Sequence, residues 1–567
     1  MESDSQSGDG NGLAGTVLPV SNWLPRYDRS WLRADALAGI TVGAAVLPEG
    51  MAYASLAGLP PETGLYASLL ALLVYVFVGT SRQVVYGPTS ALAILVATGV
   101  GSVAAGSPAD YAALVAVTTM LVGLVSVVAW LFRLGFVVNF ISESVLTGFS
   151  AGAALYITAT QLDKLFGIPR ASGTFFERLG FVATHLGATN LPTLAVGVGA
   201  LALLVLGERY ARRLPMALIV VLLATGLVAV TDLQRRGVEI VGRIPSGLPP
   251  LSIPTPPTGT LSDLVPVAFA LFLLSYVEGM SAVETFARRH DDSVDANQEL
   301  LADGLTNVAA GIGHGFVVGG SMSRSALNDE IGGKTQLASG VAAAVLALVL
   351  VFLTDLFTTL PETVLAAVVI VAVAGLVDVP ELRRIYRIDK LEFGTAASAF
   401  FGVLLFGMLD GVFIGVFVSL LVVVGRATYP YTATLGRVPD SDEFSDLSRH
   451  PENERVPGVL VYRVDAELFF ANAPTIRAEV IDAVDSRDAP VSLVVFDMRS
   501  SPTIDLTAAD MLASLAEDLD ERGIDFRLAE ADGAVRDVLA ATGAGVFDDM
   551  PLNERVVTVI EEWQREQ

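Results

Sequence analysis

Long apolar runs alternate with short polar or Pro/Gly-rich breaks from about residue 35 to residue 428. About 20 consecutive apolar residues are enough for a helix to cross the hydrocarbon core of a bilayer, so this pattern predicts a polytopic α-helical membrane protein. We expect fourteen segments, two of which are short. Their approximate spans are 35–57, 63–79, 88–101, 109–132, 136–165, 190–207, 213–231, 262–288, 295–313, 321–333, 335–357, 360–377, 392–410 and 411–428.

After about residue 430 the pattern changes to short strands that alternate with helices. The stretches PGVLVYRVDAELFFAN, VSLVVFDMRS and IDFRLAEA are expected to form strands, and NAPTIRAEVIDAVDS, LTAADMLASLAEDLDERG and AVRDVLAATGA helices. Such alternation is typical of a small α/β domain. The pattern divides the chain into an N-terminal tail (1–30), a membrane domain (31–430), a polar linker (431–456) and the α/β domain (457–567).

Two stretches of the membrane domain combine strand-like and helical patterns. In residues 315–334, a β-branched run and two glycines precede a short helix that is expected to begin near Ser321. Residues 83–100 repeat this order, with Pro88 suited to the first helical turn. Matching interrupted segments in two halves of a chain indicate a transporter binding site, because irregular backbone persists in a membrane only beside protein or a cavity. The alternative is an ordinary loop followed by a short helix in each stretch.

Arg324 lies just inside the start of the second short helix. An arginine at membrane depth is costly and is therefore a candidate functional residue. The N-terminus of a helix presents free N–H groups and the positive end of the helix dipole, so this helix and its arginine together predict an anion site. Thr89 and Ser90 supply hydroxyl groups at the corresponding position of the first stretch.

Glu49 lies between Pro48 and Gly50 in the first apolar segment, where Pro48 is expected to break the backbone hydrogen-bond ladder. Burial disfavours the charged form of a carboxyl group, so an acid in an apolar cavity can carry a proton near neutral pH. Glu49 is therefore a candidate for proton coupling, and Tyr53 is a weaker candidate for the cavity lining. The alternative for Glu49 is a structural kink whose acid pairs with a neighbouring helix.

Glu278 shares one helical face with Ser275 and with Ser281 or Ala282. It is expected either to face Arg324 and modulate it, or to hold a cation, and a structural salt bridge is the alternative. Some further polar residues fit hydrogen bonds between helices better than substrate contacts: Asn139, Glu143, Asn307 and Asp410.

Composition narrows the classes of function. Of the 567 residues, 53% are hydrophobic, and cysteine is absent, which excludes disulfides, cysteine nucleophiles and cysteine-ligated metals. The four histidines are scattered, and no metal-ligand spacing or phosphate-binding loop is present, so neither an enzyme nor a metal site nor a cofactor is expected. The net charge of −25 does not suit nucleic-acid binding, which needs a basic footprint.

The distribution of charge along the chain predicts its orientation in the membrane and the kind of organism in which it works. Thirteen Arg and Lys residues fall on one set of loops and six on the other, which predicts a plasma-membrane protein with cytoplasmic N- and C-termini. Residues 441–567 contain 28 Asp and Glu against 11 Arg, a net charge of −17. This acidic, lysine-poor surface favours a salt-loving organism, and a GC-rich genome with an ordinary acidic domain is the alternative.

Four stretches resemble the SulP family of anion transporters, solute carrier family 26. They are LPEGMAYASLAGLPPETGLYASLLALLVYVFVGTSRQVVYGPTSA, SESVLTGFSAGAALYI, DANQELLADGLTNVAAG and SMSRSALNDEIGGKTQLA. The last domain is similar to a STAS domain, and the resemblance covers about residues 30–548. In phosphorylated STAS domains an Asp-Ser-Ser-Gly loop carries the modified serine. Here the loop is Asp505-Leu506-Thr507-Ala508, so that phosphorylation is not expected.

The resemblance implies seven-plus-seven inverted repeats, core and gate domains, a homodimer and an elevator-like motion. It places the anion between the facing N-termini of the third and tenth segments. The implied substrate-binding residues are Thr89, Ser90, Ala91, Ser323, Arg324 and Ser325. Glu49 matches the acid of proton-coupled bacterial relatives, and Glu278 matches an acid that some relatives use for sodium.

These observations together predict a secondary active transporter of a small anion, coupled to protons. Sulfate is the substrate that the resemblance favours, and bicarbonate and C4-dicarboxylates are alternatives. Glu278 keeps co-transport of sodium open. Two other classes also stay open: an anion channel or uncoupled exchanger, and a sensor that signals through the STAS domain.

Overall fold

The computed structural model describes residues 18–104, 108–136, 142–210, 214–255, 260–548 and 550–567. Asn139 and most of the predicted N-terminal tail lie outside these residues. The chain divides into two compact units, Met1–Leu420 and Leu421–Gln567.

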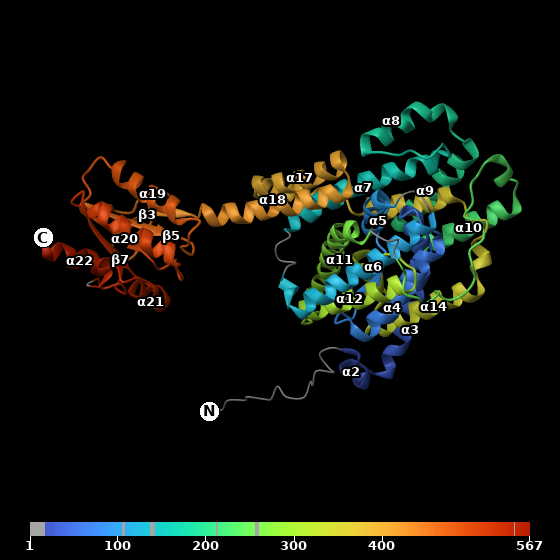
Figure 1. Cartoon of the computed structure of the whole chain (residues 1–567), viewed down its shortest axis with the longest axis horizontal. Coiled ribbons are helices and arrows are strands. Elements are labelled where there is room, and N and C mark those ends of the chain that lie inside the picture. Colours follow the sequence, from blue (N-terminus) through green and yellow to red (C-terminus); the bar gives the residue numbers. More distant parts are fainter. Residues whose placement is uncertain (1–17, 105–107, 137–141, 211–213, 256–259, 549) are drawn as a thin grey trace. The chain divides into compact units, whose positions relative to one another are not determined.

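The first unit is helical (Figure 1), and its sequence order includes two strands of three residues each. Its α-helices and strands are α2 (Val20–Trp23), α3 (Leu32–Leu56), α4 (Pro61–Val78), β1 (Val85–Gly87), α5 (Ser90–Val103), α6 (Pro108–Leu131), α7 (Glu143–Phe166), α8 (Phe175–His185), α9 (Leu191–Tyr210), α10 (Met216–Val230), α11 (Leu261–His290), α12 (Ala296–Ile312), β2 (Gly319–Ser321), α13 (Met322–Ile331), α14 (Leu337–Phe352), α15 (Glu362–Ala374), α16 (Val379–Ile388), α17 (Lys390–Phe406) and α18 (Met408–Thr428).

Each predicted apolar segment contains one of these helices. Within the described residues, seven helical stretches are long and apolar enough to cross a membrane, and four shorter helices are also apolar. The fold is therefore that of a helical membrane protein, while the count of fourteen spans and the inverted repeats stay predictions.

Pro48 lies inside the continuous helix α3, where it removes one backbone donor from the ladder as expected. Two other local expectations are corrected. The boundary between the last two segments lies at Gly407, whose positive φ of 103° ends α17, so Asp410 belongs to α18. The helices α8 and α16 were not predicted, because they are short and amphipathic rather than uniformly apolar.

The helices of the first unit pack as two groups. The first helix group comprises α3–α6 and α11–α14, which contact mainly one another. The second helix group comprises α7, α9, α10, α15 and α17, together with α18, where Gly411 lets α18 approach Val403 of α17. Between the groups, α3 contacts α10 and α15, and α5 contacts α7.

The second unit is a five-stranded sheet with helices on both faces. Its elements are β3 (Thr432–Arg437), β4 (Phe444–Asp446), β5 (Val459–Val464), α19 (Ala473–Asp485), β6 (Leu493–Asp497), α20 (Leu506–Asp520), β7 (Asp525–Ala529), α21 (Gly533–Thr542) and α22 (Val556–Glu566). The strand order is β4-β3-β5-β6-β7, in which β5, β6 and β7 run parallel and the other pairs antiparallel.

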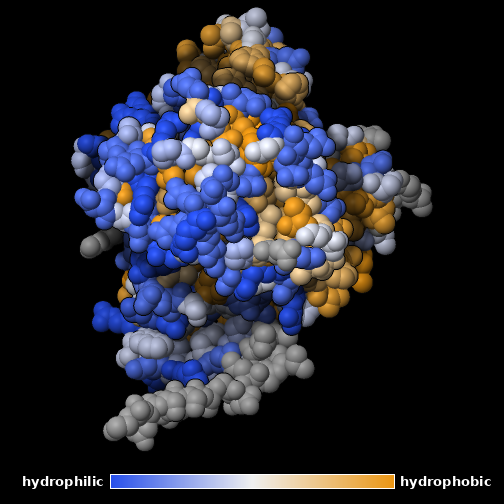
Figure 2. All heavy atoms as spheres, turned by 90° about the vertical axis from the view of Figure 1, so that its left-hand side faces the viewer, coloured by the Kyte–Doolittle hydropathy of each residue, from blue (hydrophilic) through white to orange (hydrophobic). Residues whose placement is uncertain are grey.

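Alternate residues of the central strands are buried on opposite faces of this sheet. Leu460 and Tyr462 pack in the cluster with α19, α20 and α21, whereas Val459 and Val461 pack in the cluster with α22. The face of the unit that is turned to the viewer in Figure 2 is mainly hydrophilic, in agreement with its acidic composition.

The predicted linker over residues 431–456 is also corrected, because it contributes β3 and β4 to the sheet. These strands are short and lie among charged residues, so they show little of the apolar alternation that identifies a strand.

Candidate functional site

A two-stranded antiparallel ladder brings the two interrupted stretches together. In this ladder Val85 pairs with Ser321, and Gly87 pairs with Gly319. The ladder packs closely against α11, because a Cβ atom on Gly320 would lie 2.7 Å from the Cα atom of Gly279. Glycine is therefore required for this close approach of backbones.

Each strand leads directly into the N-terminus of a short helix. Thr89 caps α5 and accepts a hydrogen bond from the backbone N–H of Leu92 (3.3 Å). Ser321 caps α13 and accepts from the N–H of Arg324 (3.5 Å). Since β1 and β2 run antiparallel, the two helix starts lie at opposite ends of this three-residue ladder, and each contributes backbone N–H groups and a positive dipole end.

Arg324 is the central charged residue of this arrangement. Only 2% of its surface is exposed, and its Nη2 atom donates to the carbonyl oxygen of Pro88 (2.8 Å). Its Nη1 atom lies 3.9 Å from Oε2 of Glu49. Within the described part of the chain, Nε and Nη1 have no hydrogen-bond partner. A buried guanidinium with unused donors is costly, and an anionic ligand would satisfy those donors.

Two carboxylates flank the helix starts. Glu49 on α3 approaches Arg324, and its side chain is 19% exposed. Glu278 on α11 accepts a hydrogen bond from the hydroxyl of Thr89 (3.0 Å). Glu278 therefore lies beside Thr89, the cap of α5, and its two predicted roles, modulation of Arg324 or binding of a cation, stay predictions. The arrangement combines one fixed cation, two helix N-termini and two acids that can balance the charge.

The remaining predicted site residues take different positions. Ser90 and Ala91 are buried in the first turn of α5, and Tyr53 is buried on α3, one turn beyond Glu49. Ser323 is exposed on α13. Ser281 is exposed on α11.

Ser325 is buried and its hydroxyl is already engaged within the protein. It accepts from the backbone N–H of Val85 (2.9 Å) and donates to the carbonyl oxygen of Ser321 (2.6 Å). This hydroxyl therefore holds β1 against α13.

The acids of α12 were not singled out from the sequence. Asp303 is fully buried and accepts from the hydroxyls of Ser126 (2.7 Å) and Ser275 (2.6 Å). Ser275 and Asn307 both donate to the carbonyl oxygen of Val318, so this network fixes the chain that leads into β2.

Glu299 has the matching role before β1. It accepts from the backbone N–H of Thr80 (2.8 Å), from the hydroxyl of the same residue and from the hydroxyl of Tyr75. Glu299 and Asp303 are four residues apart on one apolar helix, and that spacing is the signal that would have identified them.

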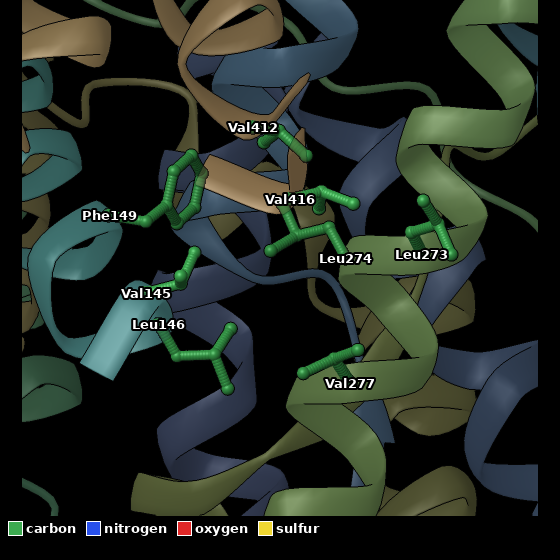
Figure 3. Close-up of a pocket in the computed structure, with 8 residues that line it drawn as sticks. All are labelled: Val145, Leu146, Phe149, Leu273, Leu274, Val277, Val412 and Val416. Atoms are coloured by element: carbon green, nitrogen blue, oxygen red, sulfur yellow. The ribbon is translucent and has the colours of Figure 1, made fainter. Parts of the chain in front are cut away.

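An apolar seam separates α11 from the second helix group. Its side chains surround a small cavity of about 20 Å³, and Figure 3 shows them converging from three helices. The seam consists of Val145, Leu146 and Phe149 of α7, Leu273, Leu274 and Val277 of α11, and Val412 and Val416 of α18. All eight of these side chains are apolar.

Relatives of known sequence resemble the chain over nearly its whole length. A probable sulfate transporter of Mycobacterium tuberculosis is 39% identical over 531 residues, which cover 93% of this chain and 95% of the relative. Solute carrier family 26 member 6 of Homo sapiens is 35% identical over 483 residues, which cover 80% of this chain and 63% of that protein.

Solved structures show the same fold. Murine solute carrier 26 family member A9, an anion transporter in its inward-facing state, matches with a TM-score of 0.89 at 25% identity, covering 100% of this chain and 96% of that one. The transmembrane domain of the cyanobacterial bicarbonate transporter BicA matches with a TM-score of 0.61 at 19% identity, covering 70% of this chain and 98% of that one.

Family profiles divide the chain as its two units do. The STAS-domain profile matches residues 450–558, within the second unit. The profile of the sulfate permease family matches residues 32–399, which is more than half of the chain. The chain therefore belongs to the sulfate permease family.

Proposed function

We propose that the protein is a secondary active transporter that carries a small anion across the membrane by alternating access. The observation that carries this proposal is Arg324, a buried cation with unused donors that reaches from the first turn of α13 to Pro88, just before α5. This arrangement recognises negative charge rather than one molecular shape. The names of the sulfate transporters among the relatives favour sulfate, and bicarbonate or a dicarboxylate remains an alternative.

Proton coupling is assigned to Glu49. When the site is empty, the ionised carboxylate faces Arg324 at 3.9 Å and compensates its charge. An entering anion competes for the same guanidinium and places two negative charges together. Protonation of Glu49 relieves that repulsion, so anion and proton are expected to bind together.

A sodium-coupled bicarbonate symporter is the second candidate. The contact that favours it is the hydrogen bond from Thr89 to Glu278, which places a carboxylate directly beside the start of α5. A carboxylate and nearby hydroxyl and carbonyl oxygens are ligands that suit a hard cation. Substitutions of Glu49 and of Glu278 therefore distinguish a proton-coupled transporter from a sodium-coupled one.

The motion is proposed to be an elevator-like displacement of the first helix group against the second. The apolar seam of Figure 3 supports this, because its apolar side chains form no hydrogen bonds that sliding would have to break. The ladder β1–β2 and the networks of Asp303 and Glu299 join both halves of the site within the first helix group, so the site would move as one body.

The proposal also covers the location, topology and assembly of the protein. The chain spans the plasma membrane of its cell many times, with both termini in the cytoplasm, and forms a homodimer. It needs no cofactor beyond the co-transported ion, and the STAS domain regulates, dimerises or signals. Cross-linking in native membranes and protease accessibility of the termini would test the assembly and the topology.

The deciding experiment is uptake of labelled sulfate, bicarbonate or fumarate into proteoliposomes, each with an inward proton gradient, an inward sodium gradient or neither. We expect proton-driven uptake of one anion, abolished in Arg324→Ala and independent of the gradient in Glu49→Gln. Arg82→Ala is the matched control, since Arg82 lies near β1 but its side chain is 54% exposed and pairs with Asp292 at 3.7 Å.

The outcomes separate the candidates. Sodium-driven uptake that is uncoupled by Glu278→Gln would favour the second candidate. Gradient-independent uptake by the wild type would indicate an exchanger or a channel. Full activity of Arg324→Ala would remove the basis of the proposed site.

A further inference from the structure

A second charged cavity lies further along the helices that form the Arg324 site. It has two adjoining parts of about 240 Å³ and 140 Å³, which share Ser55, Gly58 and Arg170 in their walls. The larger part extends between α3, α5 and α7, where Thr98 and Gln161 face it. Helical rise places Thr98 about 12 Å from Ser90, and Ser55 about 9 Å from Glu49. The cavity therefore lies about two helical turns beyond the site, on the side predicted to be external.

Cations dominate the walls of this cavity. Lys164, Arg170 and Arg178 all line it, against the two carboxylates of Asp163 and Glu362. Lys164 donates to the hydroxyl of Ser55 (2.6 Å) and lies 3.6 Å from Glu362. Its charge is thus shared with one carboxylate, and its position is fixed between α3 and α7.

The two arginines of the cavity differ in how their side chains are held. Arg178 donates to the carbonyl oxygens of Ala171 (2.7 Å) and Gly173 (2.9 Å), which fixes its guanidinium. Arg170 is exposed, and among the described residues neither arginine takes part in an ion pair. The carboxylate of Asp163 accepts the N–H groups of Lys164 and Ala171, so it orders the turn that carries Arg170.

We propose that this cavity is an outer anion-binding site that captures the substrate from the external solution and passes it toward Arg324. The ligand class is a small oxyanion, bound by the guanidinium groups of Arg170 and Arg178, with the ammonium group of Lys164 at the inner end. This inference rests on the proposed transport function and adds a second, external binding step to it. Clefts lined by one sign of charge raise the local concentration of the opposite ion.

The test is the initial rate of sulfate uptake by intact cells that express the full chain, measured against external sulfate concentration. Among the residues that the structure describes, the exposed side chain of Arg170 has no hydrogen-bond partner, so Arg170→Gln and Arg170→Glu are suitable variants. We expect KM for external sulfate to rise about threefold in Arg170→Gln and about tenfold in Arg170→Glu. The difference should shrink at high external ionic strength, because salt screens exposed charges. KM from the inner face, measured in inverted vesicles, should stay at the wild-type value.

Arg235→Gln is the matched control, since Arg235 is an exposed arginine on the same predicted side, outside the cavity. A KM within twofold of wild type in Arg170→Glu, with normal transport by the wild type, would overturn this inference alone. An equal rise of KM at both faces would also overturn it. Absence of saturable uptake by the wild type would instead overturn the proposed function on which it rests.

Discussion

Arg324 packs closely on Gly87, so a side chain at residue 87 would force the guanidinium group to shift. A Cβ atom on Gly87 would lie 3.1 Å from Nη1 of Arg324 and 3.3 Å from both Cζ and Nη2. We expect Gly87→Ala to displace the guanidinium group and to raise KM for the transported anion about tenfold, equivalent to about 1.4 kcal/mol of binding free energy. Substrate-dependent uptake in proteoliposomes measures this change.

Gly101→Ala is the control for that substitution. Residue 101 lies on the same helix α5 as the site, and no atom lies within 4 Å of a Cβ placed there. This variant should keep the wild-type KM. An unchanged KM in Gly87→Ala would show that the anion does not depend on the position of this guanidinium.

Asp497 at the end of β6 provides a pH-dependent prediction. Its side chain is nearly fully buried, and burial raises its pKa above the ordinary value of an aspartate. An acid whose pKa is raised in the folded state destabilises that state as the pH rises through the unfolded and folded pKa values. We therefore expect Asp497→Asn to raise the thermal midpoint of the STAS unit by about 2–4 °C at pH 7.5.

The gain should disappear as the pH falls toward 4, where Asp497 itself becomes neutral. The asparagine oxygen can still accept the backbone N–H of Arg499, which Asp497 accepts at 3.0 Å. A lower midpoint at pH 7.5 would mean that the positive charges of Arg499 and Arg463 outweigh the cost of burial.

At the residue scale, charged residues near the site are easier to recognise in the sequence than the hydroxyl groups that contact it. An arginine or glutamate in an apolar helix is conspicuous because its burial is costly, so Arg324, Glu49 and Glu278 were identified. Serine causes little cost in a helix, and nothing in the sequence distinguishes the bonded hydroxyl of Ser325 from the exposed one of Ser323. Their roles depend on neighbours that are remote in sequence.

Among the elements, the turn that leads into α14 is held by a residue of a helix distant in sequence. Asp35 of α3 is fully buried and accepts from the N–H groups of Lys334 (2.6 Å) and Thr335 (3.1 Å) and from the hydroxyl of Thr335 (2.7 Å). Asp35→Ala leaves these donors unpaired, so we expect it to lower the free energy of unfolding by about 2–3 kcal/mol. Thermal unfolding of the purified protein in detergent measures the loss.

Asp28→Ala is the comparison for this variant, because Asp28 makes only a local contact with the N–H of Ser30 (2.8 Å). It should cost about 0.5 kcal/mol or less. Equal losses in the two variants would contradict a special role of Asp35 in joining α3 to α14.

At the element scale, long apolar helices and buried strands were predictable, and short polar elements were not. The strand β6 shows five consecutive buried residues, and this pattern is visible in the sequence. In contrast, β4 has three residues and is stabilised by its neighbour β3 rather than by its own pattern. The pairing of β1 with β2 also could not be derived from either strand alone, since each has only three residues.

For the whole molecule, the unequal distribution of charge predicts a response to salt. Residues 441–567 carry a net charge of −17, and their repulsion opposes the compact state. Raising KCl from 0.1 M to 1 M shortens the screening length from about 10 Å to about 3 Å. We therefore expect the thermal midpoint of the STAS unit to rise with KCl, while the membrane unit changes little. A midpoint that falls with salt would contradict the interpretation of this surface as salt-adapted.

The ladder between β1 and β2 also has a consequence for biosynthesis. Val85 pairs with Ser321, so two strands of one site leave the ribosome 236 residues apart. At about 5–20 residues per second, the first strand waits roughly 10–50 s for its partner. During that interval the early half is in the membrane with its backbone groups unpaired, and a chain truncated before β2 cannot complete the site. We therefore expect the nascent chain to depend on the insertion machinery, or on transient partners, until the second half arrives.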